Sequence, residues 1–226
     1  MNTYKVCMAE SDLYISTKSD LSAEALAALK KAREELHEYI DRHPSFKTAM
    51  EPVSEESCMP DIVRNMILAS RTAGVGPMAA VAGAVSEAVG VELSKYSDEV
   101  IVENGGDIYF DIKEGKTVAV FAGDSPFSMR IGIKLVPEMS PMGMCTSSGT
   151  VGHSVSYGNA DAVVCLSSSA SLSDAAATAV GNRINTHSDI ETGLEYAQTL
   201  QGICGCMIII GDKMGVKGDM EICKIK

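Results

Sequence analysis

Apolar residues recur every three or four positions over residues 22–42, a spacing that predicts an amphipathic helix. We expect Ser22 to cap its first turn and Pro44 to stop it. The charged residues between the apolar positions should stay in water while the apolar stripe packs on a sheet. This stripe consists of Ala25, Leu29, Ala32, Leu36 and Tyr39.

Two further helices are expected to begin at prolines, which suit the first turn of a helix. Pro60 opens one with Gly74 at the position just past its end. Pro77 opens another that runs to about Val89 and ends at Gly90. Because its residues are small and apolar, it should be buried on most sides and allow close backbone approach.

From Glu99 onward the apolar pattern changes to that of strands. We expect residues 100–102, 108–112, 118–121 and 129–136 to form the core sheet, and residues 4–8 and 13–17 to form an earlier hairpin-like pair. A loop is expected over residues 138–158, a strand over 162–167, and helices over 173–184 and 190–200. The chain should close as a hairpin of residues 206–210 and 220–225, turned around 211–218. With no internal repeat or linker, this pattern predicts one α+β domain over residues 1–226.

Composition fits a packed protein, because 46% of the 226 residues are hydrophobic and 22% are charged. The formal net charge of -11 repels phosphate backbones and anionic membranes, so nucleic acid and membrane surfaces are not expected partners. Residues 1–10 lack the pattern of a signal peptide, and Pro77 and Glu87 interrupt the apolar run over 73–93. We therefore expect a cytoplasmic protein, and leave a homo-oligomer open.

Seven cysteines, an odd number scattered mostly in apolar runs, favour reduced and buried thiols over a disulfide framework. Cys204 and Cys206 are two apart on a predicted strand and should share a face. A metal site, a disulfide or a sulfur relay at this pair are alternatives to two buried strand thiols.

The first segment with candidate ligand contacts is Asn104, Gly105, Gly106 and Asp107, between two predicted strands. Paired glycines permit positive φ and remove Cβ atoms, so a flat ring or a phosphate can approach the backbone. The alternative is a tight hairpin, for which Asn-Gly is a strong signal.

The second segment lies on the helix after residue 173, where Ser173 is expected to be the N-cap. Asp174, Thr178 and Asn182 are four residues apart and lie on one helix face. A carboxylate and a hydroxyl at this spacing suit Mg²⁺ shared with a phosphate. Alternatively, Asp174 stabilises the helix N-terminus and Thr178 bonds back to the preceding turn.

The third segment combines hydroxyls and backbone N–H groups that could hold an anion, at Thr146, Ser147, Ser148 and Gly149. His153 follows, and is a candidate acid, base or hydrogen-bond donor to a ligand. The alternative is an ordinary surface loop.

In chain order, these segments resemble the ApbE superfamily, whose best-known members are Mg²⁺-dependent FAD:protein FMN transferases. Residues 81–87 are similar to the helix Ile-Ala-Lys-Gly-x-x-x-Asp of that family, with Gly83 at its glycine, and residues 102–108 are similar to the strand that ends in Gly-Gly-Asp-Ile. Residues 146–149 with His153 resemble the Thr-Ser-Gly stretch and its following histidine, and residues 174–178 resemble the metal motif Asp-Ala-x-x-Thr.

The likeness is closer still to the small single-domain ApbE-like proteins of archaea and bacteria, through residues 75–83 and 102–107. The resemblance implies a central, mostly antiparallel sheet flanked by helices, with FAD or FMN and Mg²⁺ as cofactors. It implies flavin or phosphate contacts at residues 104–107, 146–149 and Gly83, a catalytic role for His153, and metal ligands at Asp174 and Thr178.

The chain also departs from the transferases. Ala82 stands at their lysine, Glu87 at their aspartate, and no Asp-Pro-x-Thr-Gly follows His153. We therefore expect, first, a protein that binds a small phosphate- or flavin-containing ligand with a divalent metal, with or without Mg-dependent transferase-like chemistry. The alternatives are an accessory factor in anaerobic sulfur assimilation, linked in archaea to homocysteine formation, and an FAD:protein FMN transferase.

Overall fold

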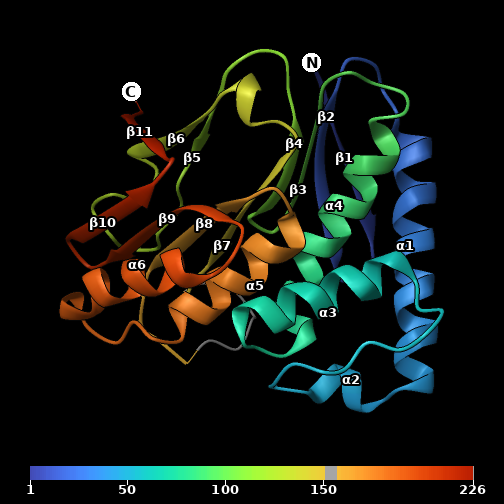
Figure 1. The fold of residues 1–226 in the computed structure, drawn as a ribbon. Helices are drawn as coiled ribbons and strands as arrows, with labels where there is room; N and C mark the ends of the chain where they lie inside the picture. The colour runs from blue at the N-terminus through green and yellow to red at the C-terminus, as the bar shows by residue number, and fades with distance from the viewer. Residues whose placement is uncertain (151–156, 226) are drawn as a thin grey trace.

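The computed structural model describes residues 1–150 and 157–225 and contains an eight-stranded antiparallel sheet (Figure 1). In spatial order its strands are β1 (Asn2–Met8), β2 (Ser11–Thr17), β3 (Val100–Asn104), β4 (Asp107–Asp111), β7 (Met142–Ser147), β8 (Ala162–Ser167), β9 (Ile203–Ile210) and β10 (Lys213–Gly218). All seven strand pairs in this sheet are antiparallel. The predicted α+β class, with a central antiparallel sheet flanked by helices, is confirmed.

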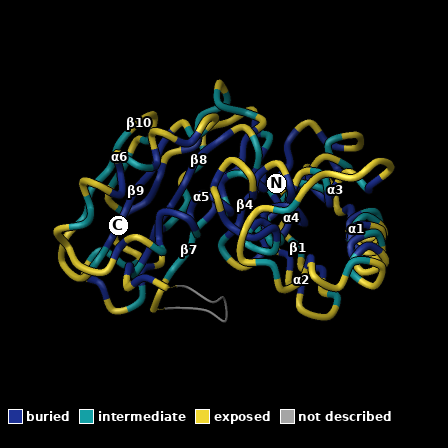
Figure 2. The backbone as a smooth tube through the Cα atoms, turned by 60° about the horizontal axis from the view of Figure 1, so that its bottom comes forward, coloured by how far each residue is buried: buried dark blue, intermediate teal, exposed yellow. Residues whose placement is uncertain are grey.

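Helices cover one face of this sheet, with α4 on β3 and β4, α5 on β7 and β8, and α6 on β9 (Figure 1). The helices are α1 (Ser22–Arg42), α2 (Ser45–Thr48), α3 (Asp61–Ala73), α4 (Val81–Leu93), α5 (Ala170–Gly181) and α6 (Ile190–Thr199), with a 3₁₀ turn η1 (Pro77–Ala80) before α4. The predicted stripe of α1 is buried, from Ala25 to Tyr39, while its outer face is exposed (Figure 2). Strands β8 and β9 lie in the buried interior (Figure 2).

A smaller sheet packs on the other face, in the order β11 (Glu221–Lys224), β6 (Ile131–Leu135), β5 (Lys116–Ala119). Its Ile133 and Leu135 join one buried cluster with Phe110 and Leu166 of the main sheet. The expectation that residues 118–121 and 129–136 belong to the core sheet is therefore wrong. Alternation identifies a strand, but it does not say which sheet the strand joins.

Two segments that we predicted to be irregular are strands. β7 lies within the expected loop of residues 138–158, between β4 and β8 at the centre of the sheet. β10 occupies the expected turn of residues 211–218 and pairs with β9, so the predicted partner segment, β11, pairs with β6 instead. Glycines conceal both strands in the sequence, since Gly143 and Gly215 are weak strand formers.

Helix ends follow the prediction in part. Gly74 ends α3 in the left-handed conformation, with φ of 70°. Ser22 is the first residue of α1 rather than its cap, and its backbone N–H donates to Asp20. Gly90 does not end α4, which continues to Leu93. The glycine instead makes room for the Tyr109 ring, with which a Cβ would collide.

α5 begins three residues before the predicted start, with the Ser169 side chain as its N-cap. Ser173 is therefore not the cap. It lies inside the helix, buried, and its hydroxyl donates to the Gly143 carbonyl. The sequence 169–173 offers several serines as caps, and packing against β7 selects the first.

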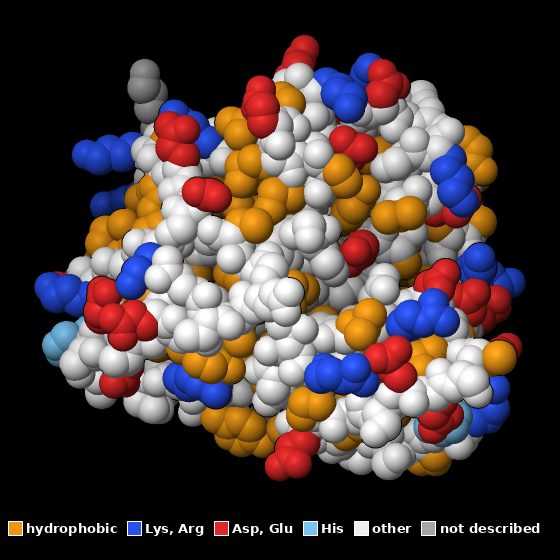
Figure 3. All heavy atoms as spheres, viewed as in Figure 1, with side chains coloured by type: hydrophobic (Ala, Val, Ile, Leu, Met, Phe, Trp, Pro, Cys, Tyr) orange, Lys and Arg blue, Asp and Glu red, His pale blue; other side chains and the backbone are white. Residues whose placement is uncertain are grey.

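Positive and negative side chains are interspersed over the face shown in Figure 3, with hydrophobic side chains gathered among them. Over the described residues, no single helix has the length and apolar character needed to cross a membrane. α3 and the Pro77–Leu93 segment pass that test together, as a pair bent by 107°.

Candidate functional site

A cavity of about 780 Å³ lies at the end of the β3–β4 hairpin, between α4, α5 and the smaller sheet. It gathers residues from all three candidate segments, which are far apart in the sequence. The predicted site residues on its wall are Gly105, Gly106, Asp107, Thr146, Ser147, Ser148, Asp174 and Thr178. Gly83, Asn104 and Gly149 are not part of the wall, and His153 lies outside the described residues.

The β3–β4 connection is a two-residue hairpin in which Asn104 pairs with Asp107. Gly105 and Gly106 adopt φ of 64° and 105°, which favours glycine at both positions. The Asn104 side chain is buried and donates to the carbonyl of Ala82 on α4, at 3.1 Å. The two interpretations of this segment are thus compatible, because the tight hairpin itself forms part of the cavity wall.

The helices α4 and α5 cross in close contact beside this hairpin. A Cβ at Gly83 would collide with the Ala170 carbonyl, and one at Gly143 would collide with the Ala170 backbone. The close approach lets the Gly83 N–H donate to Asp174 Oδ2 at 2.9 Å. Gly83 therefore acts on the site through Asp174.

Glu87 holds the same crossing together from one turn further along α4. Its Oε2 accepts hydrogen bonds from the Ser169 hydroxyl, the Ser171 hydroxyl and the Ser171 N–H, each 2.9–3.0 Å long. These donors belong to the first turn of α5, the helix that carries Asp174. The sequence marks Glu87 as a break in an apolar run and as a departure from a family pattern, and the structure shows it as a partly buried link between helices.

Two carboxylates, Asp107 and Asp174, lie together in the cavity and repel each other. Burial raises the pKa of Asp174 to about 7, although its carboxylate still faces the cavity. Burial, and then the charge of Asp174, raises the pKa of Asp107 well above its usual value. Asp107 Oδ1 is buried without a hydrogen-bond partner among the described residues. Perturbed carboxylates in a cavity are typical of functional sites.

Asp174, Thr178 and Asn182 all line the cavity, as their spacing on one helix face predicts. Asp174 is in the middle of α5, so it is too far from the N-terminus to stabilise that end. The Thr178 hydroxyl makes no hydrogen bond with a described residue, and so does not bond back to the preceding turn. Asn182 accepts from the Tyr157 N–H.

The third segment divides between strand and loop. Thr146 and Ser147 end β7 and line the cavity with Ser148. Gly149 is not part of the wall; its N–H donates to the Ala160 carbonyl, and a Cβ on Gly149 would collide with the Gly158 carbonyl. This glycine therefore serves packing.

Several cavity residues were not found from the sequence. The smaller sheet contributes Val118 and Ile133 to an apolar wall that continues at Val120, just after β5. Two cations, Lys47 and Arg183, also line the cavity. Nothing local marks these residues, since each becomes a wall residue only when its element packs beside the hairpin. The stacking of Arg183 on Tyr196 likewise depends on how α6 packs.

The cysteine pair does not form a shared site. Cys204 is exposed and Cys206 is buried, with its sulfur 3.8 Å from that of Cys165 on the neighbouring strand. All seven cysteines are free thiols, and within residues 1–150 and 157–225 no three of the His, Cys, Asp and Glu side chains are grouped to hold a metal.

A divalent cation nevertheless fits the carboxylate pair. The unpartnered Asp107 Oδ1 and the Asp174 carboxylate provide two negative oxygens, and Thr178 adds a hydroxyl on the same wall. Mg²⁺ commonly takes one or two carboxylates and completes its shell with water and phosphate oxygens. A bound cation would also relieve the repulsion between the two carboxylates.

The antiparallel sheet and its helical layer are those of the ApbE-like fold. The chain belongs to the family described as AbpE bacteria, whose profile matches residues 2–204. It is 41% identical over 197 residues to the UPF0280 protein of Methanocella arvoryzae, covering 85% of this chain and 79% of that protein. It is 37% identical over 234 residues to the UPF0280 protein of Methanococcus aeolicus, covering 97% and 94%.

Solved structures with this fold include the flavin transferase ApbE from Vibrio cholerae, with a TM-score of 0.61, 13% identity and 96% of each chain covered. The apo form of the flavinyl transferase ApbE from Pseudomonas stutzeri matches with a TM-score of 0.62 and 13% identity, covering 96% of this chain and 94% of that one. At such identity these likenesses establish the fold.

Proposed function

We propose that this protein binds a small phosphate- or flavin-containing ligand together with a divalent cation in the cavity beside the β3–β4 hairpin. The observation that carries the proposal is the pair of carboxylates in the cavity: Asp107 Oδ1 is buried and has no hydrogen-bond partner among the described residues, and the pKa of Asp174 is raised. Such a pair is costly to keep charged, and a cation offsets that cost.

The remaining walls suit the ligand. Backbone at Gly105 and Gly106 is open to close approach, and the aliphatic side chains of the smaller sheet provide a surface for an organic ring. A volume of about 780 Å³ is in the range of small-molecule sites. Asp107, Asp174 and Thr178 would hold the cation, which would supply positive charge for a ligand phosphate.

Calorimetric titration with Mg²⁺ and FAD, FMN or ADP tests this proposal. Metal and ligand should bind cooperatively to the wild-type chain. Asp174→Asn should abolish the Mg²⁺-dependent part of ligand binding, and Thr178→Val should weaken that binding less. Asp41→Asn, which removes one carboxylate from the exposed side of α1, is the matched control and should bind like the wild type. A wild-type chain that binds none of the three ligands with Mg²⁺ rejects the proposal.

A second candidate function is transfer of FMN from FAD to a protein hydroxyl, favoured by the fold shared with structures described as flavin transferases. In that reaction the pyrophosphate bond breaks, the hydroxyl oxygen bonds to the FMN phosphorus, its proton is released, and AMP leaves. Ala82 lacks the positive charge of the lysine that the transferase pattern has at this position. Release of AMP from FAD in the presence of Mg²⁺, with a mass gain of FMN on an acceptor peptide, would establish the activity. A chain that binds FAD but releases no AMP would reject this function.

A further inference from the structure

Arg183 follows the C-terminal end of α5 and is held in a fixed orientation. Its guanidinium stacks on the Tyr196 ring, with 3.7 Å from its central carbon to the ring centroid. One of its N–H groups donates to the Ala179 carbonyl at 2.6 Å. Tyr196 is itself anchored, since its hydroxyl donates to the Ala73 carbonyl at 3.1 Å. The plane and position of the guanidinium are therefore set by three elements, α3, α5 and α6.

This fixed cation has no carboxylate partner among the described residues, although the chain is strongly acidic. Its neighbours on the cavity wall are Asn182 and, one turn earlier on α5, Thr178. The bond to Ala179 uses only part of the guanidinium fork. The remaining donors can bind a phosphate in the bidentate manner for which arginine is suited.

Lys47, the other cation on the wall, lacks these features. It lies on the short helix α2, makes no ion pair with a described residue, and no contact orients its flexible side chain. The C-terminal carbonyls of α5 disfavour an anion nearby, so a phosphate at this end of the cavity needs a positioned cation.

We propose that Arg183 is the phosphate-binding residue of the cavity, and that the ligand is an organic phosphate whose phosphate lies at the C-terminal end of α5. The proposal rests on the proposed function and adds to it the orientation of the ligand. The apolar wall of the smaller sheet receives the organic part of the ligand. Asp174 and Asp107 hold the cation, which lies between the organic part and the phosphate.

Equilibrium binding of three probes in the presence of Mg²⁺ tests this assignment: pyrophosphate, FMN and riboflavin. Arg183→Met should weaken the binding of pyrophosphate and of FMN by about tenfold or more. It should leave riboflavin, which has no phosphate, within about twofold of the wild type. Arg183→Lys keeps the charge without the planar fork and should give an intermediate loss. If Arg183→Met does not fold, as judged by thermal unfolding, Arg183→Lys provides the same comparison.

Lys47→Met is the matched control, because it removes the same charge from the same cavity. It should weaken the binding of pyrophosphate and of FMN by less than about threefold. An equal loss in Lys47→Met and Arg183→Met would show that the overall field, and not contact with Arg183, attracts the phosphate, and would overturn the proposal.

The outcomes separate this proposal from the proposed function. If Arg183→Met binds FMN as tightly as the wild type does, the flavin site stands and the role of Arg183 falls. If the wild type binds pyrophosphate through Arg183 but neither flavin, the anion site stands and the flavin ligand is rejected. If the wild type binds none of the probes, both proposals are overturned.

Discussion

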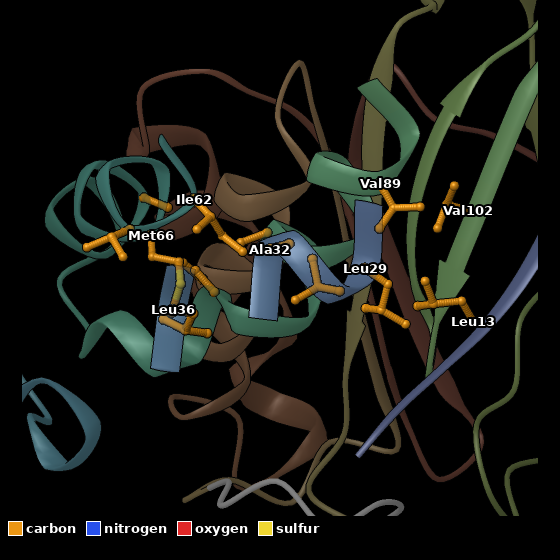
Figure 4. Close-up of a cluster of buried hydrophobic side chains, with 14 of the residues drawn as sticks. Leu13, Leu29, Ala32, Leu36, Ile62, Met66, Val89 and Val102 are labelled. Carbon is orange, nitrogen blue, oxygen red and sulfur yellow. The ribbon is translucent and has the colours of Figure 1, made fainter. Parts of the chain in front are cut away.

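The core around α1 and the crossing of α4 with α5 are packed by opposite means. Around α1, large aliphatic side chains such as Leu29, Leu36 and Met66 fill the space between helices and sheet (Figure 4). At the crossing, Gly83 and Ala170 leave no room for side chains, and backbone meets backbone. The first arrangement stabilises the fold by apolar burial, while the second places an N–H group against the Asp174 carboxylate. The apolar burial around α1 and the placement of the Asp174 carboxylate therefore depend on different residues.

Leu29→Ala should have the largest effect on stability and a small effect on the site. Leu29 is fully buried, so its truncation leaves a cavity and should lower the free energy of unfolding by about 3 kcal/mol. Leu26, on the exposed side of the same helix, provides the control, because Leu26→Ala should cost less than about 0.5 kcal/mol. Urea denaturation measures both. A large loss of Mg²⁺-dependent binding by folded Leu29→Ala would remove the distinction between the two regions.

Gly83→Ala should lower stability by about 2 kcal/mol and damage the site as well, because the added methyl group forces α4 and α5 apart. The hydrogen bond from the Gly83 N–H to Asp174 would be lost or lengthened. Gly115→Ala is the control, since its Cβ would meet only the Leu135 carbonyl, at an ordinary 3.6 Å. Denaturation and Mg²⁺ titration of both variants check this. Unchanged Mg²⁺ binding in Gly83→Ala would show that the crossing does not position Asp174.

Asp174→Asn should increase stability in EDTA at high pH. The pKa of Asp174 is about 7 in the folded chain against an ordinary value of 3.8, so the folded state holds this proton more tightly than the unfolded state. Below pH 3.8 the carboxyl group is protonated in both states and contributes nothing to the free energy of unfolding. As the pH rises from 3.8 to about 7, the free energy of unfolding falls, and above pH 7 the loss is complete. Asparagine removes the charge and can still accept from the Gly83 N–H.

We expect the variant to exceed the wild type by roughly 1–2 kcal/mol at pH 8, less than the full pKa shift implies, because Asp174 is partly solvated and interacts with Asp107. The difference should vanish near pH 4. Denaturant unfolding at a series of pH values measures it, with Asp41→Asn as the control. A variant less stable than the wild type at pH 8 would contradict the raised pKa.

Local chemistry was sufficient to predict many elements. The periodic stripe of α1, the left-handed Gly74 after α3 and the Asn-Gly hairpin were identified from neighbouring residues alone. Asp174 and Thr178 were placed on one face by helical spacing, and the structure brings them onto the cavity wall. The prediction of a metal and a flavin there stays a prediction until binding is measured.

The predictions that were wrong concern choices between distant partners. β7 and β10 contain glycines that weaken the local strand signal, and they become strands because neighbouring strands offer them hydrogen bonds. β5 and β6 were identified as strands but assigned to the wrong sheet. Pairing free energy depends on which edges and apolar faces are nearby, and the sequence pattern does not contain that information.

The amino-acid sequence by itself determined the periodic helices, the hairpin glycines and the family to which the chain belongs, because each depends on residues close together or on matched motifs. Only the tertiary structure decided the electrostatics of the site. The raised pKa of Asp174, the burial of Asp107 Oδ1 and the stacking of Arg183 arise from contacts between α4, α5, α6 and the sheet. Desolvation and charge interactions depend on distance in space, so they exist only once these elements pack together.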